Sequence, residues 1–483
     1  MFLEAWRTEL PWLRIASSVS QFVKCNVCDW LKLQIDQTPR DQPLVLAALK
    51  ARLGSHYSFQ SAQRLKQGQL EEICRASKGD KWMMKIDKME SQAINLPVIW
   101  SQQATPLFKL GNRLTVAVNG SMWAGTNHTS VHMRTLFLDT PHDANMQIST
   151  ILKNLHEAAM LEKRLPYELI IGSDNTPKDT KNKYFIWFCI WLLAAMATTG
   201  CPLWSILYVS LLVGHTHDNL DRFFSRLRVA MAGHDVYTLL DLAKIIEENL
   251  RGFDVRMSHL TTVWKWHDLE DFGIPPCQGL RNIHTMNVFY HNGHGIYVKW
   301  KQYMTSEEWS APVLLLPEHR MAEFARFRPR QVEQTFRKRN LDEQSLMTAW
   351  LDKFETSLRE EQRQKHAQDT KWLRRIINRQ DPVYTDGPSV DTILRDLESL
   401  GRGRSVQDQR PVETLLPHDA IVQLFAGADH PPMPVDALVS IPRVWEHPPP
   451  SNVVAPGACF LFVAILFIQT TALPPPLPLT RTS

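Results

Sequence analysis

The segment Val213–Ser225, VGHTHDNLDRFFS, brings two histidines and two aspartates within seven positions. These four residues are His215, His217, Asp218 and Asp221. They directly follow an apolar run, SILYVSLLV, whose composition is typical of a buried strand. Ionisable groups at the exit of a buried strand usually face a functional site. The segment therefore predicts such a site at one end of a sheet.

A second apolar run, ELIIGSDNT, also ends in an acid, with Asp174 and Asn175 at its exit. Farther upstream, Asp87 ends the shorter apolar run MMKID. Enzymes that cut phosphodiesters with two metal ions need about three carboxylates that converge on one point. Mg²⁺ and Mn²⁺ favour oxygen ligands, so aspartate is the residue type expected there. We therefore expect Asp87, Asp174 and Asp221 to be metal ligands and catalytic residues.

The acids at the strand exits also have a structural interpretation. Asp174 and Asn175 can cap the helix that begins near Lys181, or form an Asx turn after the strand. Asp218 lies at the start of the following predicted helix, where the helix dipole favours an acid. Asp221 is for this reason the preferred ligand, and Asp218 the preferred capping residue.

His215 and His217 lie at positions i and i+2 of a predicted loop. This spacing is a weak signal for a transition metal, because zinc normally takes three or four ligands supported by further hydrogen bonds. Positioning of the acids, or contact with a phosphate, explains the pair equally well. The histidines are therefore supporting residues of the predicted site.

Composition places the chain among ordinary globular proteins. Its 483 residues are too many for one core, and 44% of them are hydrophobic and 22% charged. A net charge of +4 permits nucleic-acid binding but does not argue for it. Seven cysteines without a regular framework indicate a reducing compartment, and the N-terminus lacks the apolar core of a signal peptide. We therefore expect a nuclear or cytoplasmic protein.

The pattern of the chain indicates an α/β fold. Strand-like runs alternate with helix-like runs between residues 81 and 255, which is typical of a mostly buried sheet flanked by helices. We expect five segments: a helical N-terminal region 1–80 with a CxxC pair, an α/β core 81–255, a small β-rich appendage 256–320, a charged helical segment 321–380, and a mostly disordered tail 381–483.

Cys25 and Cys28 form the CxxC pair, and His56 and Cys74 are candidate partners for a zinc ion. A zinc element ahead of a DNA-acting core would be consistent with DNA binding. The alternative is a pair of packed thiols or a redox pair, because no second CxxC follows.

A basic run with interleaved phenylalanines is a candidate DNA contact, since Lys and Arg release counterions from phosphates and aromatic rings stack on bases. Its cations include Arg326, Arg328, Arg330, Arg337, Lys338 and Arg339. The alternative is a solvated amphipathic helix, because acids such as Glu323 and Glu333 dilute the charge.

The tail contains an uncharged apolar stretch, residues 457–473, of about the shortest length that spans a bilayer. It predicts either a C-terminal membrane anchor or a degenerate terminus. The apolar run 185–197 is shorter and sits between two predicted strands, so we expect it to be a buried core helix.

Several blocks of the sequence resemble a large transposase-like family that is catalogued as a domain of unknown function. They are IDKMESQ, LTVAVNGSMWAG, HMRTLFLD, SDNTPKDTKNKY and LLVGHTHDNLDRFFSRL. The resemblance covers roughly residues 20–310 and implies a ribonuclease-H-like core of transposon origin. In such a core the first carboxylate lies on the first strand, the second ends the fourth strand, and the third lies on a later helix.

By this resemblance Asp87, Asp174 and Asp221 are the three ligands, in that order. The glycine that the family has after its first aspartate is replaced here by Lys88, which is either a phosphate contact or a mark of decay. The chain is thus either an active polynucleotidyl transferase or an inactive domesticated relative that binds nucleic acid or protein. Transposases commonly act as multimers, so the resemblance also implies a homo-oligomer. Other hydrolase classes lack support, since the chain has no G-x-S-x-G motif, P-loop or G-x-G-x-x-G motif.

Overall fold

The computed structural model describes the following parts of the chain: residues 25–89, 95–96, 114–127, 131–137, 143–173, 180–212, 219–234, 236, 239–249, 255–260, 262–272, 280–332 and 388–401, with separate positions between 348 and 374. The chain divides into two units, Met1–Ala428 and Asp429–Ser483. All described residues belong to the first unit.

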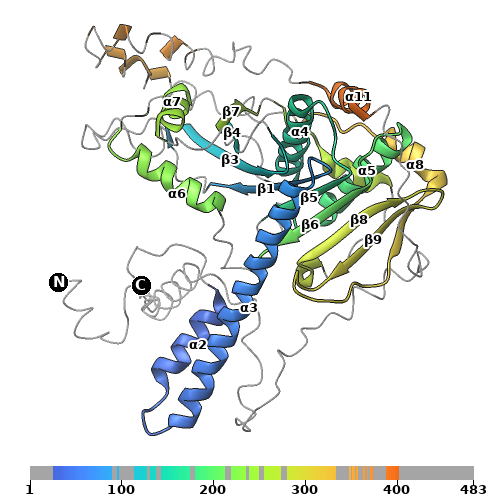
Figure 1. Cartoon of the computed structure of the whole chain (residues 1–483). Helices are drawn as coiled ribbons and strands as arrows, with labels where there is room; N and C mark the ends of the chain where they lie inside the picture. Colours follow the sequence, from blue (N-terminus) through green and yellow to red (C-terminus); the bar gives the residue numbers. More distant parts are fainter. Residues whose placement is uncertain are drawn as a thin grey trace, which may run out of the picture. The chain divides into compact units, whose positions relative to one another are not determined.

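The described strands form one mixed sheet of ten strands (Figure 1). They are β1 (Lys81–Lys88), β2 (Asn95–Leu96), β3 (Leu114–Ala124), β4 (Val131–Phe137), β5 (Glu168–Ser173), β6 (Ser205–Ser210), β7 (Val255–His259), β8 (Thr285–His291), β9 (Gly295–Lys301) and β10 (Val313–Pro317). Their order across the sheet is β10-β9-β8-β6-β5-β1-β3-β4-β7, and β2 pairs with β3.

The centre of the sheet is parallel. β1 pairs in parallel with β5, and β5 pairs in parallel with β6. β3 runs antiparallel to β1, and β4 antiparallel to β3. Because parallel strands end at the same edge, the exits of β1, β5 and β6 share one edge of the sheet. The predicted α/β class, a mixed sheet flanked by helices, is confirmed.

One face of the sheet carries the main core. It is covered by α4 (Ala144–Glu162), α5 (Lys183–Thr198), α8 (Glu318–Ala325) and α11 (Val390–Gly401). α5 is apolar on all sides, and its residues from Phe185 to Met196 are buried, as expected for a helix inside a core. The predicted interpretation of this run as a core helix is confirmed.

The opposite face carries α3 (Pro43–Ala76) and α6 (Asn219–Met231). The end of α3 packs on the sheet through Cys74, which belongs to a cluster with Met83 and Ile170. α6 contacts β1 and β3, and α7 (Leu239–Asn249) contacts α6 and β7. α2 (Asn26–Gln37) packs on α3, as Figure 1 shows.

Local chemistry explains where the core helices begin and end. Asp143 caps α4 by accepting hydrogen bonds from the backbone N–H groups of Asn145 and Met146. A glycine follows each of the two helices that flank β6: Gly200 and Gly233 have φ angles of +73° and +88°, a region in which only glycine is unstrained.

Two segments differ from the sequence expectation. Strands β8, β9 and β10, in the segment 256–320, continue the core sheet beyond β6 instead of forming an appendage of their own. Residues 390–401, expected in the disordered tail, form α11, which buries Val390, Ile393 and Leu397 in the main core. Both segments are apolar on one side, and burial of that side outweighs their polar surroundings in the sequence.

Among the described residues, no helix combines the length and the apolar character that a bilayer crossing requires. The apolar stretch 457–473 lies outside the described residues.

Candidate functional site

Asp87 lies near the end of β1 and is half-buried. Its Oδ1 atom accepts a hydrogen bond of 2.7 Å from the backbone N–H of Lys88. Across the antiparallel pair it lies opposite Gly120, and opposite residues project from the same face of a sheet. A Cβ atom at Gly120 would lie 2.9 Å from Leu220 Cδ1 and 3.0 Å from Phe224 Cζ, both in α6. Asp87 therefore projects from the face that α6 covers.

Asp221 lies in the first turn of α6 and is half-buried. It follows Leu220, which is buried against the sheet at Gly120. Leu220 and Phe224, one turn apart, fix this helix on β3 beside β1. The structure thus places the helix that carries Asp221 over the sheet face that carries Asp87.

The exit of β5 lies beside that of β1. The register pairs Ser173, the last residue of β5, with Ile86 of β1 and with Ser210 of β6. Several predicted site residues follow β5 or β6 directly in the chain but lie outside the described residues: Asp174, Asn175, His215, His217 and Asp218.

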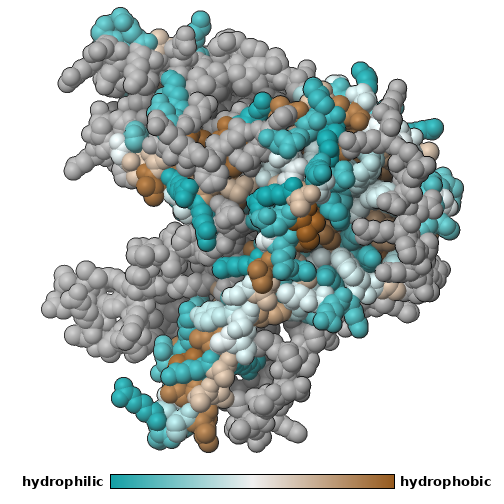
Figure 2. Space-filling view, viewed as in Figure 1, coloured by the Kyte–Doolittle hydropathy of each residue, from teal (hydrophilic) through white to brown (hydrophobic). Residues whose placement is uncertain are grey.

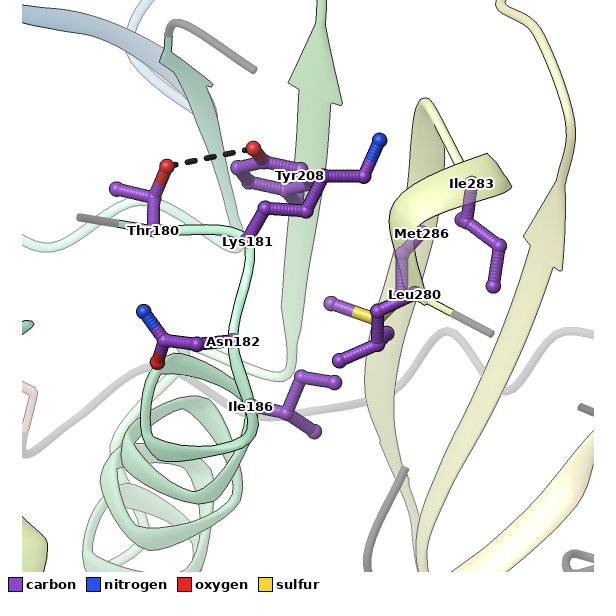
Figure 3. Close-up of a pocket in the computed structure, with 8 residues that line it drawn as sticks. All are labelled: Thr180, Lys181, Asn182, Ile186, Tyr208, Leu280, Ile283 and Met286. Atoms are coloured by element: carbon purple, nitrogen blue, oxygen red, sulfur yellow. Dashed lines mark hydrogen bonds between the residues drawn. The ribbon is translucent and has the colours of Figure 1, made fainter. Parts of the chain in front are cut away.

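A hydroxyl network joins the exits of β5 and β6. The Ser173 and Thr180 hydroxyl oxygens lie 2.6 Å apart, and Ser173 donates a 3.0 Å hydrogen bond to the Tyr208 hydroxyl. Thr180 and Tyr208 lie 3.3 Å apart, as the dashed line in Figure 3 shows. The network holds the residues just before α5 against the strand exits.

Lys181 is buried beside this network, in a small pocket that it lines with Tyr208 and Met286 (Figure 3). Burial lowers the pKa of Lys181 to about 7, because the protein interior solvates an ammonium group poorly. Burial, together with the nearby charge of Lys181, lowers the pKa of His284 to about 3. A phosphate or carboxylate that reached Lys181 would favour its charged form.

A buried ion pair lies on the same face as Asp87. Lys85, two residues before Asp87 in β1, forms an ion pair with Glu71 of α3, and their side chains are 8% and 12% exposed. Glu71 also contacts Arg75 at 3.2 Å. The pair fixes α3 to the strand that carries Asp87.

A second candidate site lies between α2 and α3. Cys25, Cys28 and His56 are all buried, and each offers a ligand atom within 4.8 Å of the others. Cys25 Sγ lies 3.2 Å from His56 Nε2. Burial raises the pKa of the Cys25 thiol and lowers the pKa of His56. This group can hold a metal ion.

The structure separates the two candidate partners of the CxxC pair. His56 joins Cys25 and Cys28, whereas Cys74 packs in the cluster under the sheet. The two residues lie 18 positions apart on one helix, which corresponds to roughly 27 Å. Burial raises the pKa of Cys74 to about 12, as expected of a packed thiol. The prediction that Cys74 is a candidate partner of the CxxC pair is therefore wrong.

The basic run is described in part. Arg328 forms an ion pair with Asp391 of α11, and Arg330 with Asp268 at 2.8 Å. These two guanidinium groups thus contact acids of the same chain. Arg326 follows α8, and the remaining cations, Arg337, Lys338 and Arg339, lie outside the described residues.

Residues 109–306 match the profile of a protein family described as "Domain of unknown function (DUF7869)". The matched part includes Asp174, Asp221 and strands β3 to β9, but neither Asp87 nor the CxxC pair. No curated protein and no solved structure matches the chain. The predicted likeness to a domain of unknown function is confirmed, over a shorter part of the chain than expected.

Sequence reasoning missed two residues of the candidate site, Lys181 and Gly120. Lys181 lies in SDNTPKDTKNKY, between Lys178 and Lys183, and no feature of the sequence distinguishes it as the buried one. Gly120 interrupts the strand LTVAVNGSMWA, and a glycine inside a strand often marks close approach of another element. That signal is present in the sequence.

Proposed function

We propose that this chain is a transposon-derived, ribonuclease-H-like protein that cleaves or joins DNA strands in the presence of Mg²⁺ or Mn²⁺. One observation carries the proposal: α6, with Asp221 in its first turn, covers the sheet face from which Asp87 projects. The order of elements also supports it, since Asp174 directly follows β5 and Asp221 lies on the helix after β6.

Asp87, Asp174 and Asp221 would hold the ions. Their donor set fits, because carboxylate oxygens are the ligands that Mg²⁺ prefers. Ser173 of β5 is in register with Ile86, the residue before Asp87 in β1. Asp174 is bonded to Ser173, and consecutive Cα atoms lie about 3.8 Å apart. When bound, two such ions activate a water or a 3′-hydroxyl and stabilise the leaving oxygen.

Lys181 has a role in the same proposal. Its ammonium group lies beside the β5 and β6 exits, where a phosphate of the DNA would enter. Arrival of that phosphate would favour the charged form of Lys181, so that the protonated fraction of the amine rises when the substrate binds. His215, His217 and Lys88 would orient the acids or contact the backbone of the DNA.

The ion that Cys25, Cys28 and His56 can hold is, in this proposal, Zn²⁺. Two thiolates and an imidazole are ligands that zinc takes, whereas Mg²⁺ prefers oxygen. A zinc element next to the core would help to present the chain to DNA. Arg326, Arg328 and Arg330 are weaker candidates for that contact, since two of them have acidic partners in the chain.

The alternative function is that of an inactive, domesticated relative that binds nucleic acid or protein. Lys88 stands where the family that the sequence resembles has glycine, and this departure favours the alternative. Measurements of DNA cleavage and of DNA binding separate the two functions. Cleavage requires the aspartates and the ion, whereas binding without cleavage requires neither.

The test is nicking of supercoiled DNA by the purified full chain with Mg²⁺ or Mn²⁺. We expect cleavage by the wild type and a loss of at least about 100-fold in Asp174→Asn and in Asp221→Asn. Asp241→Asn is the matched control, because Asp241 occupies the first turn of the neighbouring helix α7. Equal cleavage by all four proteins contradicts the proposed site, and DNA binding without cleavage by any of them supports the inactive relative.

A further inference from the structure

The helical pair α2–α3 has little apolar core of its own. Of the 12 residues of α2, only Cys28 and Leu31 are buried. Seven large apolar side chains of the two helices are exposed: Val27, Leu33, Leu44, Val45, Tyr57, Leu65 and Ile73. Figure 2 shows patches of brown surface over this part of the chain. Small units with so little buried apolar surface commonly need a metal or a disulfide.

The candidate ligands occupy the contact between the two helices. Cys25 precedes α2 and Cys28 lies in its first turn, so both thiols face α3 from one end of the helix. His56 comes from the middle of α3, and Gln60 follows it one helical turn later on the same face. The chain thus has the spacing Cys-x₂-Cys followed by His-x₃-Gln, and zinc sites with two cysteines and two histidines commonly have a ligand where Gln60 stands.

Gln60 is buried and its amide already lies in the cluster. The amide nitrogen lies 3.9 Å from Cys28 Sγ and also contacts His56 Nε2. The two ends of a glutamine amide exchange places by a half-turn about its last bond. That half-turn directs the oxygen Oε1, which can bind a cation, at the space between the three ligands.

We propose that Zn²⁺ is held by Cys25, Cys28 and His56 with the Gln60 amide oxygen in the fourth position, and that this ion locks α2 onto α3. The inference rests on the zinc assignment made under the proposed function and adds the fourth ligand and the structural role. Binding releases the two thiol protons to the solvent, since zinc binds the thiolates. An amide oxygen is a weaker zinc ligand than an imidazole, so we expect this site to bind zinc less tightly than a site with two cysteines and two histidines.

The experiment is a titration of the full chain with Co²⁺, whose visible absorption and thiolate charge-transfer band report ligand type and geometry, followed by competition with Zn²⁺. Four proteins are compared: the wild type, Cys28→Ser, Gln60→His and Ser61→His. Gln60→His places an imidazole at the fourth position. Ser61→His is the control, because Ser61 is the next residue on the helix and is exposed to solvent.

We expect one Co²⁺ per chain with two thiolate ligands, loss of the charge-transfer band in Cys28→Ser, and binding about tenfold or more tighter in Gln60→His. Ser61→His should match the wild type. Binding by the wild type without tightening in Gln60→His would overturn the fourth position while leaving the zinc assignment in place. No thiolate band in any of the four proteins would overturn the zinc assignment itself.

A second readout tests the structural role without relying on affinity. Backbone amide exchange in α2 should become at least about tenfold faster when zinc is removed by a chelator, while exchange in α5 of the core should stay unchanged. Equal exchange in α2 with and without zinc would overturn the proposed lock. Circular dichroism of Cys28→Ser under the same conditions shows whether the rest of the chain stays folded.

Discussion

Asp87 lies directly opposite Gly120 in the β1–β3 pair, and Gly120 is the point at which α6 touches the sheet. The absence of a side chain at Gly120 lets Leu220 and Phe224 approach the strand. That approach brings the first turn of α6, with Asp221, over the face that carries Asp87. Gly120, which has no functional group in its side chain, thus determines how Asp87 and Asp221 are arranged.

Gly120→Val should therefore disturb both stability and cleavage. The added side chain would overlap Leu220 and Phe224, and overpacking of this kind lowers the free energy of unfolding by about 1–3 kcal/mol. Urea denaturation and the nicking assay measure the two effects. Gly54→Ala is the control: no atom lies within 4 Å of its added methyl, and it should stabilise α3 by about 0.5–1 kcal/mol. Wild-type stability in Gly120→Val would contradict the packing described.

The ion pair Lys85–Glu71 predicts an asymmetric result. Lys85→Met leaves the Glu71 carboxylate buried without its closest cation, and we expect a loss of about 3 kcal/mol in the free energy of unfolding. Arg75→Met removes the other cation near Glu71, but Arg75 is 52% exposed, so the loss should stay below about 1 kcal/mol. Equal losses in the two variants would show that the buried pair does not fix α3 to β1.

His284 predicts a pH dependence of stability. Burial lowers its pKa to about 3 in the folded chain, against about 6.5 when unfolded. Between these values the unfolded chain binds a proton that the folded chain does not, so stability falls as the pH falls. From pH 7 to pH 5 the contribution is about 2 kcal/mol, at about 1.4 kcal/mol per pH unit below 6.5. Thermal or urea unfolding of His284→Gln should show a correspondingly flatter profile, and parallel profiles would contradict the assignment.

The fold could be predicted from the sequence where periodicity and end signals agree. The buried helix α5 and its stop at Gly200 follow from a continuous apolar run and a glycine. The membership of β8 in the core sheet could not be predicted, because β8 pairs with β6, whose residues lie 76 to 84 positions earlier, and strand periodicity does not identify the partner.

α11 shows how an overall composition can hide a local pattern. Its Val390, Ile393, Leu394 and Leu397 have the i, i+3, i+4, i+7 spacing of a helix with one buried face. The surrounding prolines and charges led to the expectation of a disordered tail. The structure instead packs α11 on α4, where His156 contacts Asp396 at 2.9 Å.

Leu397→Ala tests this packing. Leu397 is completely buried in the main core, so we expect a loss of about 2–5 kcal/mol in the free energy of unfolding. Arg395→Ala, on the exposed side of the same helix, should change it by less than about 0.5 kcal/mol. A loss below 1 kcal/mol for Leu397→Ala would show that α11 is not part of the core.

The sequence predicts which residue types form the candidate site better than it predicts which residues lie next to one another. The exits of β1 and β5 and the helix that follows β6 were identified from apolar runs that end in acids. Lys181 could not be distinguished from its neighbouring lysines, because burial depends on the tertiary fold. Likewise, the preference for His56 over Cys74 depends on how α2 packs along α3, and the sequence has no signal for that register.

The proposal that Asp87, Asp174 and Asp221 surround one metal site is tested most directly by cleavage of the chain itself. With Fe²⁺ in place of Mg²⁺ and with ascorbate and peroxide, hydroxyl radicals cut the backbone next to the bound ion, and mass spectrometry locates the cuts. We predict cuts near residues 87, 174 and 221 that excess Mg²⁺ suppresses and that Asp174→Asn abolishes together. Cuts near only one of these residues, or cuts that Asp174→Asn leaves unchanged, would contradict a shared site.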